Sequence, residues 1–132
     1  MGMRVGNRRG TVVYTTGILR KNPRTRFVLV DAVNLGQASR NITVQVIDWS
    51  NGSPVPLKVV PCNTRRCTQV VGPNKSVFLY ADVSKVQFKY EVRIIQPANR
   101  RFVTNVFGVT KTPFKPLEGG TVLQHDLVKI GR

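Results

Sequence analysis

The sequence has few of the residues that carry most enzyme chemistry. Its 132 residues include six Asp and Glu and one histidine. A nucleophile–base pair needs a general base, yet His125 stands in Gln-His-Asp on an expected strand, where neighbouring side chains point to opposite faces. The carboxylates are scattered along the chain, so local spacing places no pair for acid–base catalysis. We therefore expect that the protein is not an enzyme.

Signatures of cofactor, metal and membrane binding are missing as well. The chain has neither a Gly-x-x-x-x-Gly-Lys nor a Gly-x-Gly-x-x-Gly motif, and two cysteines with one histidine do not complete a tetrahedral zinc site. We expect no cofactor, no metal and no small-molecule substrate. The longest apolar runs, such as Phe27–Val30, fall far short of the roughly 18 residues of a membrane-spanning helix. No membrane partner and no secretory signal peptide are expected.

The two cysteines stand close together, in Pro-Cys-Asn-Thr-Arg-Arg-Cys. This spacing is too wide for the two-residue redox motif, whereas a four-residue loop between strand ends can bring two Cβ atoms within disulfide reach. We favour a hairpin-closing disulfide between Cys62 and Cys67. A pair of reduced, buried thiols and a bridge between subunits are the alternatives.

Short β-rich runs, each followed by turn residues, recur about every ten positions, which is typical of a sandwich or barrel. Over residues 41–49, apolar and polar side chains alternate, and the Asn-Gly pair in 50–53 is a strong hairpin signal. The return strand contains Pro54 and Pro56, which cannot donate to a ladder, so we expect it at a sheet edge.

The clearest alternation runs over residues 86–94. We expect five of its side chains to face inward: Val86, Phe88, Tyr90, Val92 and Ile94. The alternate positions should face outward: Gln87, Lys89, Glu91 and Arg93. No segment has a convincing helical period, and Val, Ile and Thr are abundant.

These patterns predict an all-β protein, an antiparallel β-sandwich of eight or nine strands, with jelly-roll topology preferred over an immunoglobulin-like one. Residues 1–10 should form a flexible basic N-terminal arm, and residues 11–132 a single β-sandwich domain. Its terminal strand is expected over 121–130, after a hinge at Gly119-Gly120. That strand could complete its own sheet or pair with the open edge of a neighbouring subunit.

The charge is strongly one-sided, with 21 Lys and Arg and a net charge of +15. Such a field attracts nucleic acid or another polyanion, or keeps free subunits soluble by mutual repulsion. The candidate polyanion contacts are the basic residues that precede the first acidic one: Arg4, Arg8, Arg9, Arg20, Lys21, Arg24 and Arg26. Asp31 and Asp48 interrupt apolar strands, and we interpret them as acceptors of backbone or arginine hydrogen bonds, or as anchors for a neighbouring subunit's arginine.

Three stretches carry a resemblance to a known group of proteins. They are Gln45-Val-Ile-Asp-Trp-Ser-Asn-Gly-Ser-Pro-Val, Val77-Phe-Leu-Tyr-Ala-Asp-Val-Ser and Lys89-Tyr-Glu-Val-Arg-Ile. Over about residues 40–110 the chain resembles small β-proteins of spore-forming Bacillus-type bacteria, similar to the subunits of endospore appendages. The resemblance implies a jelly-roll subunit that stacks into a filament on the spore surface, released when the mother cell lyses. Appendage subunits of the best-known type carry cysteines in the N-terminal arm for covalent links, whereas residues 1–10 have none, so the resemblance does not extend to cross-linking through that arm.

Three functions follow from these observations. We favour a structural subunit that self-assembles into an extracellular or spore-surface filament by β-sheet augmentation and terminal-arm exchange, so that its partners are other copies of itself. The alternative is a nucleic-acid-binding or capsid-type jelly-roll protein that uses its basic arm. A carbohydrate-binding sandwich with Trp49, Tyr80 or Tyr90 as a platform ranks third.

Overall fold

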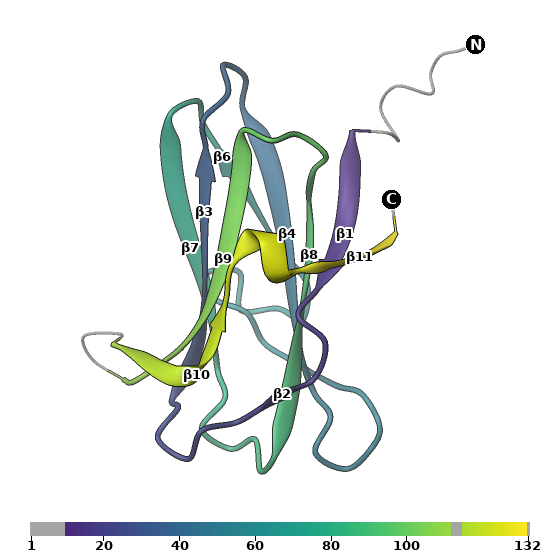
Figure 1. The fold of residues 1–132 in the computed structure, drawn as a ribbon, viewed down its shortest axis with the longest axis vertical. Coiled ribbons are helices and arrows are strands. Elements are labelled where there is room, and N and C mark those ends of the chain that lie inside the picture. The colour runs from purple at the N-terminus through teal and green to yellow at the C-terminus, as the bar shows by residue number, and fades with distance from the viewer. Residues whose placement is uncertain (1–9, 112–114, 132) are drawn as a thin grey trace.

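The fold was analysed in a computed structural model, which describes residues 10–111 and 115–131. The described chain contains eleven β-strands and one short 3-10 helix, η1 (Figure 1). The strands are β1 (Thr11–Thr15), β2 (Leu19–Arg20), β3 (Phe27–Asn34), β4 (Arg40–Asp48), β5 (Val55–Leu57), β6 (Cys67–Val71), β7 (Lys75–Asp82), β8 (Lys89–Pro97), β9 (Phe102–Val109), β10 (Pro116–Val122) and β11 (Val128–Gly131). Within these ranges no helix is long and apolar enough to cross a membrane.

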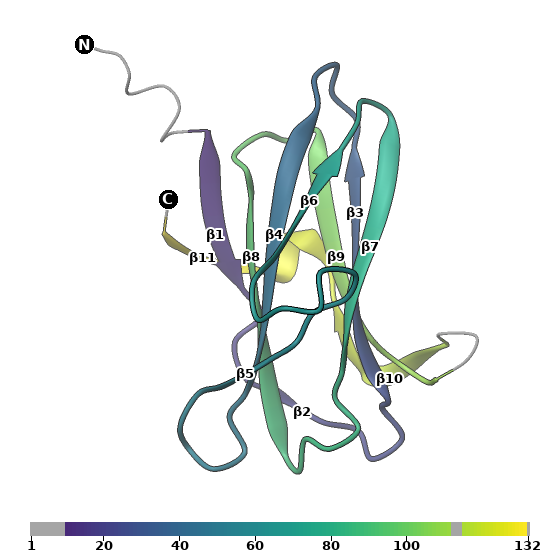
Figure 2. The same cartoon turned by 180° about the vertical axis from the view of Figure 1, so that it is seen from behind.

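The strands form two antiparallel sheets that pack face to face. The seven-stranded sheet has the order β11-β1-β8-β4-β5, with β6 also paired to β4 and β2 also paired to β8. The four-stranded sheet has the order β10-β9-β3-β7 (Figures 1 and 2). The predicted all-β antiparallel sandwich is therefore confirmed, with more strands than the eight or nine expected because several are short. The preferred jelly-roll topology is not confirmed by this strand order.

The core lies between the two sheets and follows from the alternation of side chains along the strands. In β4, Ile42, Val44 and Val46 are fully buried, as the sequence predicts. In β8, Val92 and Ile94 are also fully buried and lie opposite Val46 and Val44 of β4. Each such side chain contributes about 1.5–3 kcal/mol by leaving water, so the alternation alone fixes which face of each sheet turns inward.

The segment before β8 differs from the prediction. The strand begins at Lys89 rather than at Val86, because the chain first makes a turn in which the Val86 amide donates to the Val83 carbonyl. Val86 is still buried, but Phe88 is 55% exposed, so its expected inward orientation is wrong. Tyr90 faces the core as predicted.

The C-terminal segment also differs from the single strand expected over 121–130. Strand β10 pairs with β9 in one sheet, η1 (Gln124–Asp126) follows, and β11 pairs with β1 in the other sheet. The chain must turn here because it crosses from one sheet to the other, and the Leu127 amide closes the turn by donating to the Gln124 carbonyl at 3.2 Å. The predicted terminal strand is thus two strands joined by a crossover.

The expected hinge at Gly119-Gly120 is likewise wrong, since both residues lie inside β10. Gly119 has a φ of 82°, a left-handed conformation that glycine adopts most easily. A Cβ on Gly120 would lie 3.1 Å from the backbone of Gly108 in β9. The pair therefore forms an irregularity in the strand, where β10 approaches β9 too closely for a side chain.

Candidate assembly edges and anion-binding groove

Both edges of the seven-stranded sheet carry exposed apolar side chains. In the described part of that sheet, β11 lies at one edge and pairs with β1 alone, and β2 lies on the same side of β8 as β1. At the other edge, β5 and β6 pair with β4. On β11, Val128 and Ile130 are 57% and 51% exposed. At the opposite edge, Val55 and Val70 are 47% and 65% exposed. The prolines correctly predict that β5 is an edge strand.

Strand β11 is held by few contacts. It pairs with β1 at three positions, Val13–Gly131, Tyr14–Lys129 and Thr15–Val128, and the register shifts between the first two. Edge strands present backbone N–H and C=O groups that can pair with another chain. In this structure β11 completes the chain's own sheet and leaves its outer side as a short edge.

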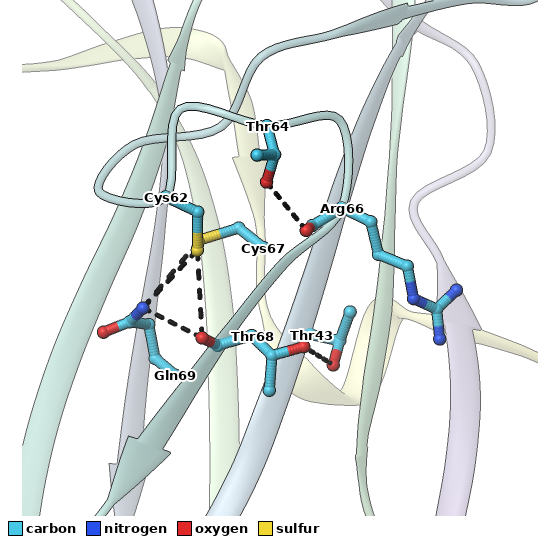
Figure 3. The surroundings of a disulfide bond; sticks show 7 residues. All are labelled: Thr43, Cys62, Thr64, Arg66, Cys67, Thr68 and Gln69. Carbon is cyan, nitrogen blue, oxygen red and sulfur yellow. Dashed lines mark hydrogen bonds between the residues drawn. A yellow bond between two sulfur atoms is a disulfide. The ribbon is translucent and has the colours of Figure 1, made fainter.

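A disulfide closes the loop that leads into β6. Cys62 and Cys67 are joined by an S–S bond, with their Cα atoms 5.4 Å apart, which confirms the predicted pairing (Figure 3). The Thr64 hydroxyl donates to the Arg66 carbonyl at 2.9 Å and holds the loop together. The hydroxyls of Thr43 and Thr68, 2.7 Å apart, tie the start of β6 to β4. The loop is thus a fixed part of the edge formed by β5 and β6.

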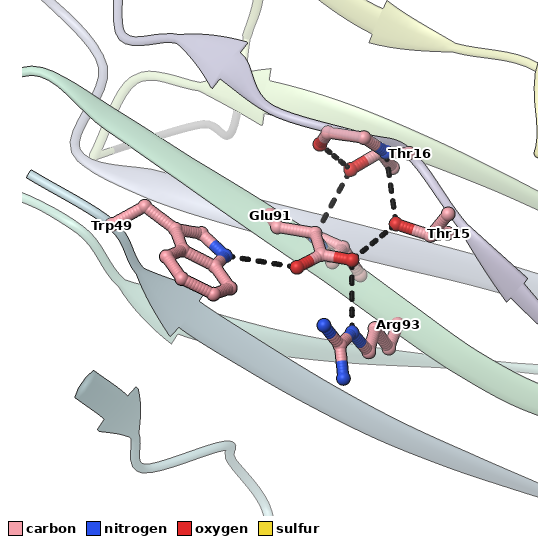
Figure 4. A network of polar contacts seen from close by, with 7 residues as sticks. Thr15, Thr16, Trp49, Glu91 and Arg93 are labelled. Atoms are coloured by element: carbon pink, nitrogen blue, oxygen red, sulfur yellow. Dashed lines mark hydrogen bonds and ion pairs between the residues drawn. The ribbon is translucent and has the colours of Figure 1, made fainter. Parts of the chain in front are cut away.

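Glu91 is the centre of a polar network on the outer face of the seven-stranded sheet (Figure 4). Its side chain accepts hydrogen bonds from the indole N–H of Trp49 at 2.9 Å, from the Arg93 Nε–H at 2.9 Å and from the Thr15 hydroxyl. Although it points outward, Glu91 is 5% exposed. Burial by itself raises the pKa of this carboxyl, but the hydrogen bonds from Arg93, Thr15 and Trp49 outweigh it and lower the pKa.

This network bears on the predicted platform residues. Because the Trp49 N–H is bound to Glu91, the indole is part of the sheet surface, half-buried. Tyr90 is 1% exposed, and burial raises the pKa of its phenol to about 12. Tyr90 is therefore a core residue and cannot be a carbohydrate platform. The sequence pattern places Glu91 outside but does not reveal that three donors cover it.

The two predicted anchor acids occupy different settings. Asp48 accepts a hydrogen bond from the Ser50 amide at 2.9 Å, so it stabilises the turn after β4. Asp31 is exposed on the outer face of the four-stranded sheet, in register with Phe78 of β7 and Asn105 of β9. Partial burial among these neighbours raises the pKa of the Asp31 carboxyl. The intersubunit role of both residues stays a prediction.

The structure describes four of the seven predicted polyanion contacts. Arg4, Arg8 and Arg9 lie outside the described residues, whereas Arg20 and Arg24 are exposed. Lys21 and Arg26 have structural roles. The Lys21 Nζ donates to the carbonyls of Ser84 and Val86 at 3.0 and 2.9 Å. The Arg26 Nε lies 3.8 Å from an Asp82 oxygen, and its guanidinium lies 5.9 Å from the centroid of the Phe27 ring.

Two hollows lie at the end of the sandwich where β1 starts. The β3–β4 connection, the β8–β9 connection and the start of β1 meet there (Figure 1). The hollows, of about 510 and 450 Å³, share Ala98 and Asn99 in their walls. Thr11 and Pro97 line the first, and their strand neighbours Val12 and Gln96 line the second, so the hollows lie on opposite faces of the β1–β8 pair, on either side of the β8–β9 connection. We call the two hollows together the end groove.

The end groove is lined by basic and amide side chains. Arg40 belongs to the first hollow, and Arg100 and Lys129 belong to the second. None of the described residues that line either hollow is an aspartate or a glutamate. Sequence reasoning missed this site because its cations come from the start of β4, the β8–β9 connection and β11, which are far apart in the chain.

Neither a protein-family model nor a curated protein matches the chain. Three solved structures are similar to it at low sequence identity. The protein named "Thermotoga maritima 1070" shares 13% sequence identity with this chain; the match covers 93% of this chain and 96% of that protein's chain, with a TM-score of 0.47. The Anabaena sensory rhodopsin transducer is 12% identical, with 72% and 79% covered and a TM-score of 0.39. The E. coli chaperone DraB is 16% identical, with 83% and 48% covered and a TM-score of 0.33.

These likenesses are too distant to carry an argument about function. The resemblance to spore-appendage subunits stays a prediction.

Proposed function

We propose that this chain is a structural subunit that assembles with copies of itself by pairing the β11 edge of one seven-stranded sheet with the β5–β6 edge of the next. The observation that carries the proposal is the exposure of Val128 and Ile130 at one edge and of Val55 and Val70 at the other. Apolar side chains at a sheet edge favour strand pairing with another chain.

The position of the two edges favours an open assembly. They are the two opposite ends of the strand order of one sheet, so a contact between them joins two different surfaces of neighbouring subunits. Such head-to-tail contacts build rings when the rotation closes and filaments when it does not. A short β11 that pairs with β1 at three positions also supports the exchange of this terminal strand between neighbours.

The net charge of +15 opposes this contact. Ion pairs between a Lys or Arg and a carboxylate in the described part of the chain join Arg26 to Asp82 and Arg93 to Glu91, so most positive charge is uncompensated there. Subunits should therefore repel one another at low ionic strength and associate as salt screens them, since the Debye length falls from about 30 Å at 0.01 M to about 8 Å at 0.15 M.

The disulfide supports a place of action outside the cell. Disulfides persist mainly in oxidising compartments and on cell or particle surfaces, and the Cys62–Cys67 bond closes a loop directly at the β5–β6 edge. A filament on the outside of a cell or spore is the setting we propose for the assembled form.

Sedimentation velocity over a range of protein and salt concentrations tests the proposal. Wild-type protein should form larger species as salt rises from about 0.01 to about 0.15 M. An Ile130→Lys substitution places a charge in the edge contact and should leave the protein as single subunits under the same conditions.

The matched control is Leu35→Lys. Leu35 and Ile130 are 50% and 51% exposed, but Leu35 lies in the connection between β3 and β4, outside the strands of both edges. The control should assemble like the wild type. Loss of assembly in both variants, or in neither, would show that the β11 edge is not the contact.

A further inference from the structure

We propose that the end groove binds the phosphodiester backbone of a nucleic acid, with Arg40, Arg100 and Lys129 as its cationic contacts. This inference is independent of self-assembly. It also differs from the sequence-based expectation, which places the polyanion contacts in the residues before Asp31.

The charge of the end groove supports an anionic ligand. Arg40, Arg100 and Lys129 are exposed, and in the described part of the chain none of them forms an ion pair with a carboxylate. Arg101 adjoins Arg100 in the chain and is exposed at the same turn. A hollow that gathers cations without a neutralising carboxylate raises the local concentration of anions.

The neutral residues of the end groove suit phosphate better than bases. Ser39, Asn41 and Asn99 line the first hollow and are exposed, and side chains of these types commonly donate to phosphate oxygens in protein–DNA complexes. The aromatic residues that line the second hollow are Tyr14, which is half-buried, and Phe102, which is 1% exposed. Neither offers an open face for base stacking. Binding should therefore depend on phosphate contacts, which carry no sequence information.

The cations near the start of the chain are less suited to this role. Among those that the structure describes, Lys21 donates to two backbone carbonyls and Arg26 lies beside Asp82. Arg20 and Arg24 are exposed, but they belong to the connection between β1 and β3 and line neither hollow. They provide a control with the same charge at another place on the molecule.

The test is fluorescence anisotropy with a labelled 20-base-pair DNA duplex and the full chain, over a salt series. The triple variant Arg40→Gln, Arg100→Gln, Lys129→Gln removes three charges from the end groove. Each phosphate contact contributes about −0.9 to the slope of log affinity against log salt, so the slope should become less negative by about 2.7. Affinity at 0.1 M salt should fall by roughly 10²–10³-fold.

The control triple is Arg20→Gln, Arg24→Gln, Lys85→Gln, which also removes two arginines and one lysine from exposed positions. For this control triple, the slope of log affinity against log salt should equal that of the wild type. The variant Arg40→Lys, Arg100→Lys retains the charge and should keep most of the affinity. Because all these side chains are exposed, each variant should melt within a few degrees of the wild type, which shows that the fold is intact.

Several results would overturn the proposal. An equal loss of affinity in both triple variants would mean that the duplex responds to overall charge and not to the end groove. An unchanged slope in the end-groove triple would exclude its three cations as contacts. Binding of a sulfated polysaccharide such as heparin, without binding of the duplex at 50 mM salt, would assign the groove to a different polyanion.

Discussion

Replacing Glu91 with glutamine removes one negative charge from the best-connected polar group that the structure describes on the outer face of the seven-stranded sheet. The glutamine side chain has the same shape, so the strand pairing of β8 with β1 and β4 should persist. Three donors, from Thr15, Trp49 and Arg93, would then face an amide in place of a carboxylate. We expect Glu91→Gln to destabilise the fold.

The magnitude follows from the contacts. Hydrogen bonds to a charged partner contribute about 1.5–3 kcal/mol each, but they are not additive within one network. The Arg93 side chain is 38% exposed, so water compensates part of that interaction. We therefore expect the free energy of unfolding to fall by about 2–3 kcal/mol at pH 7, and the Tm by roughly 10 °C.

The pH dependence gives an independent signature. The pKa of Glu91 in the folded protein lies below its ordinary value of 4.5. A carboxyl whose pKa is lowered by folding stabilises the protein fully above its unfolded pKa, and this stabilisation disappears as pH falls through the folded pKa. The difference in stability between the wild type and Glu91→Gln should thus be constant from pH 8 to about pH 5 and shrink below it.

Urea denaturation followed by tryptophan fluorescence measures both effects, since Trp49 is part of the network. Asp48→Asn is the matched control: it also removes one carboxylate charge, but the amide oxygen can still accept from the Ser50 N–H, so the loss should stay below about 1 kcal/mol. A Glu91→Gln protein within about 0.5 kcal/mol of the wild type, or a difference that does not change with pH, would refute the reasoning.

Three further predictions concern single features of the fold. Asp31→Asn should raise the free energy of unfolding slightly at neutral pH, because folding raises the pKa of this carboxyl. The gain should vanish in urea titrations at acidic pH, where the wild-type carboxyl is neutral as well. Gly120→Ala should lower the Tm more than Gly52→Ala. The Cβ added at Gly120 meets backbone at 3.1 Å, whereas the Cβ added at Gly52 meets nothing within 4 Å. At Gly52 only the positive φ opposes the substitution, and it costs about 1 kcal/mol. Equal losses in the two glycine variants would contradict the close approach of β10 and β9. Reducing the disulfide should lower the free energy of unfolding by about 2 kcal/mol, the entropy of one short loop, and a double Cys62→Ala, Cys67→Ala variant should no longer respond to reductant.

The parts of the fold that depend on local pattern were predictable from the sequence. Alternation assigned the inward faces of β4 and of most of β8, and two prolines marked β5 as an edge strand. The cysteine spacing predicted the disulfide. In each case the physical cause acts between residues that are close in the chain, so the signal is present in a short window.

The parts that depend on contacts between distant segments were not predictable in this way. The exposure of Phe88 depends on a turn that delays the start of β8, and the crossover at η1 depends on where the two sheets lie. Glu91 gains its three donors from β1, from the residue after β4 and from β8 itself. The end groove needs two connections, the start of β1 and β11 to meet, which no periodicity reveals.

Negative-stain electron microscopy of the wild-type protein, at high concentration in about 0.15 M salt and after nuclease treatment, tests self-assembly most directly. Filaments with a regular subunit repeat that survive the nuclease are the expected result. Dispersed particles of single-subunit size at every protein concentration, salt concentration and redox condition would contradict the proposed role.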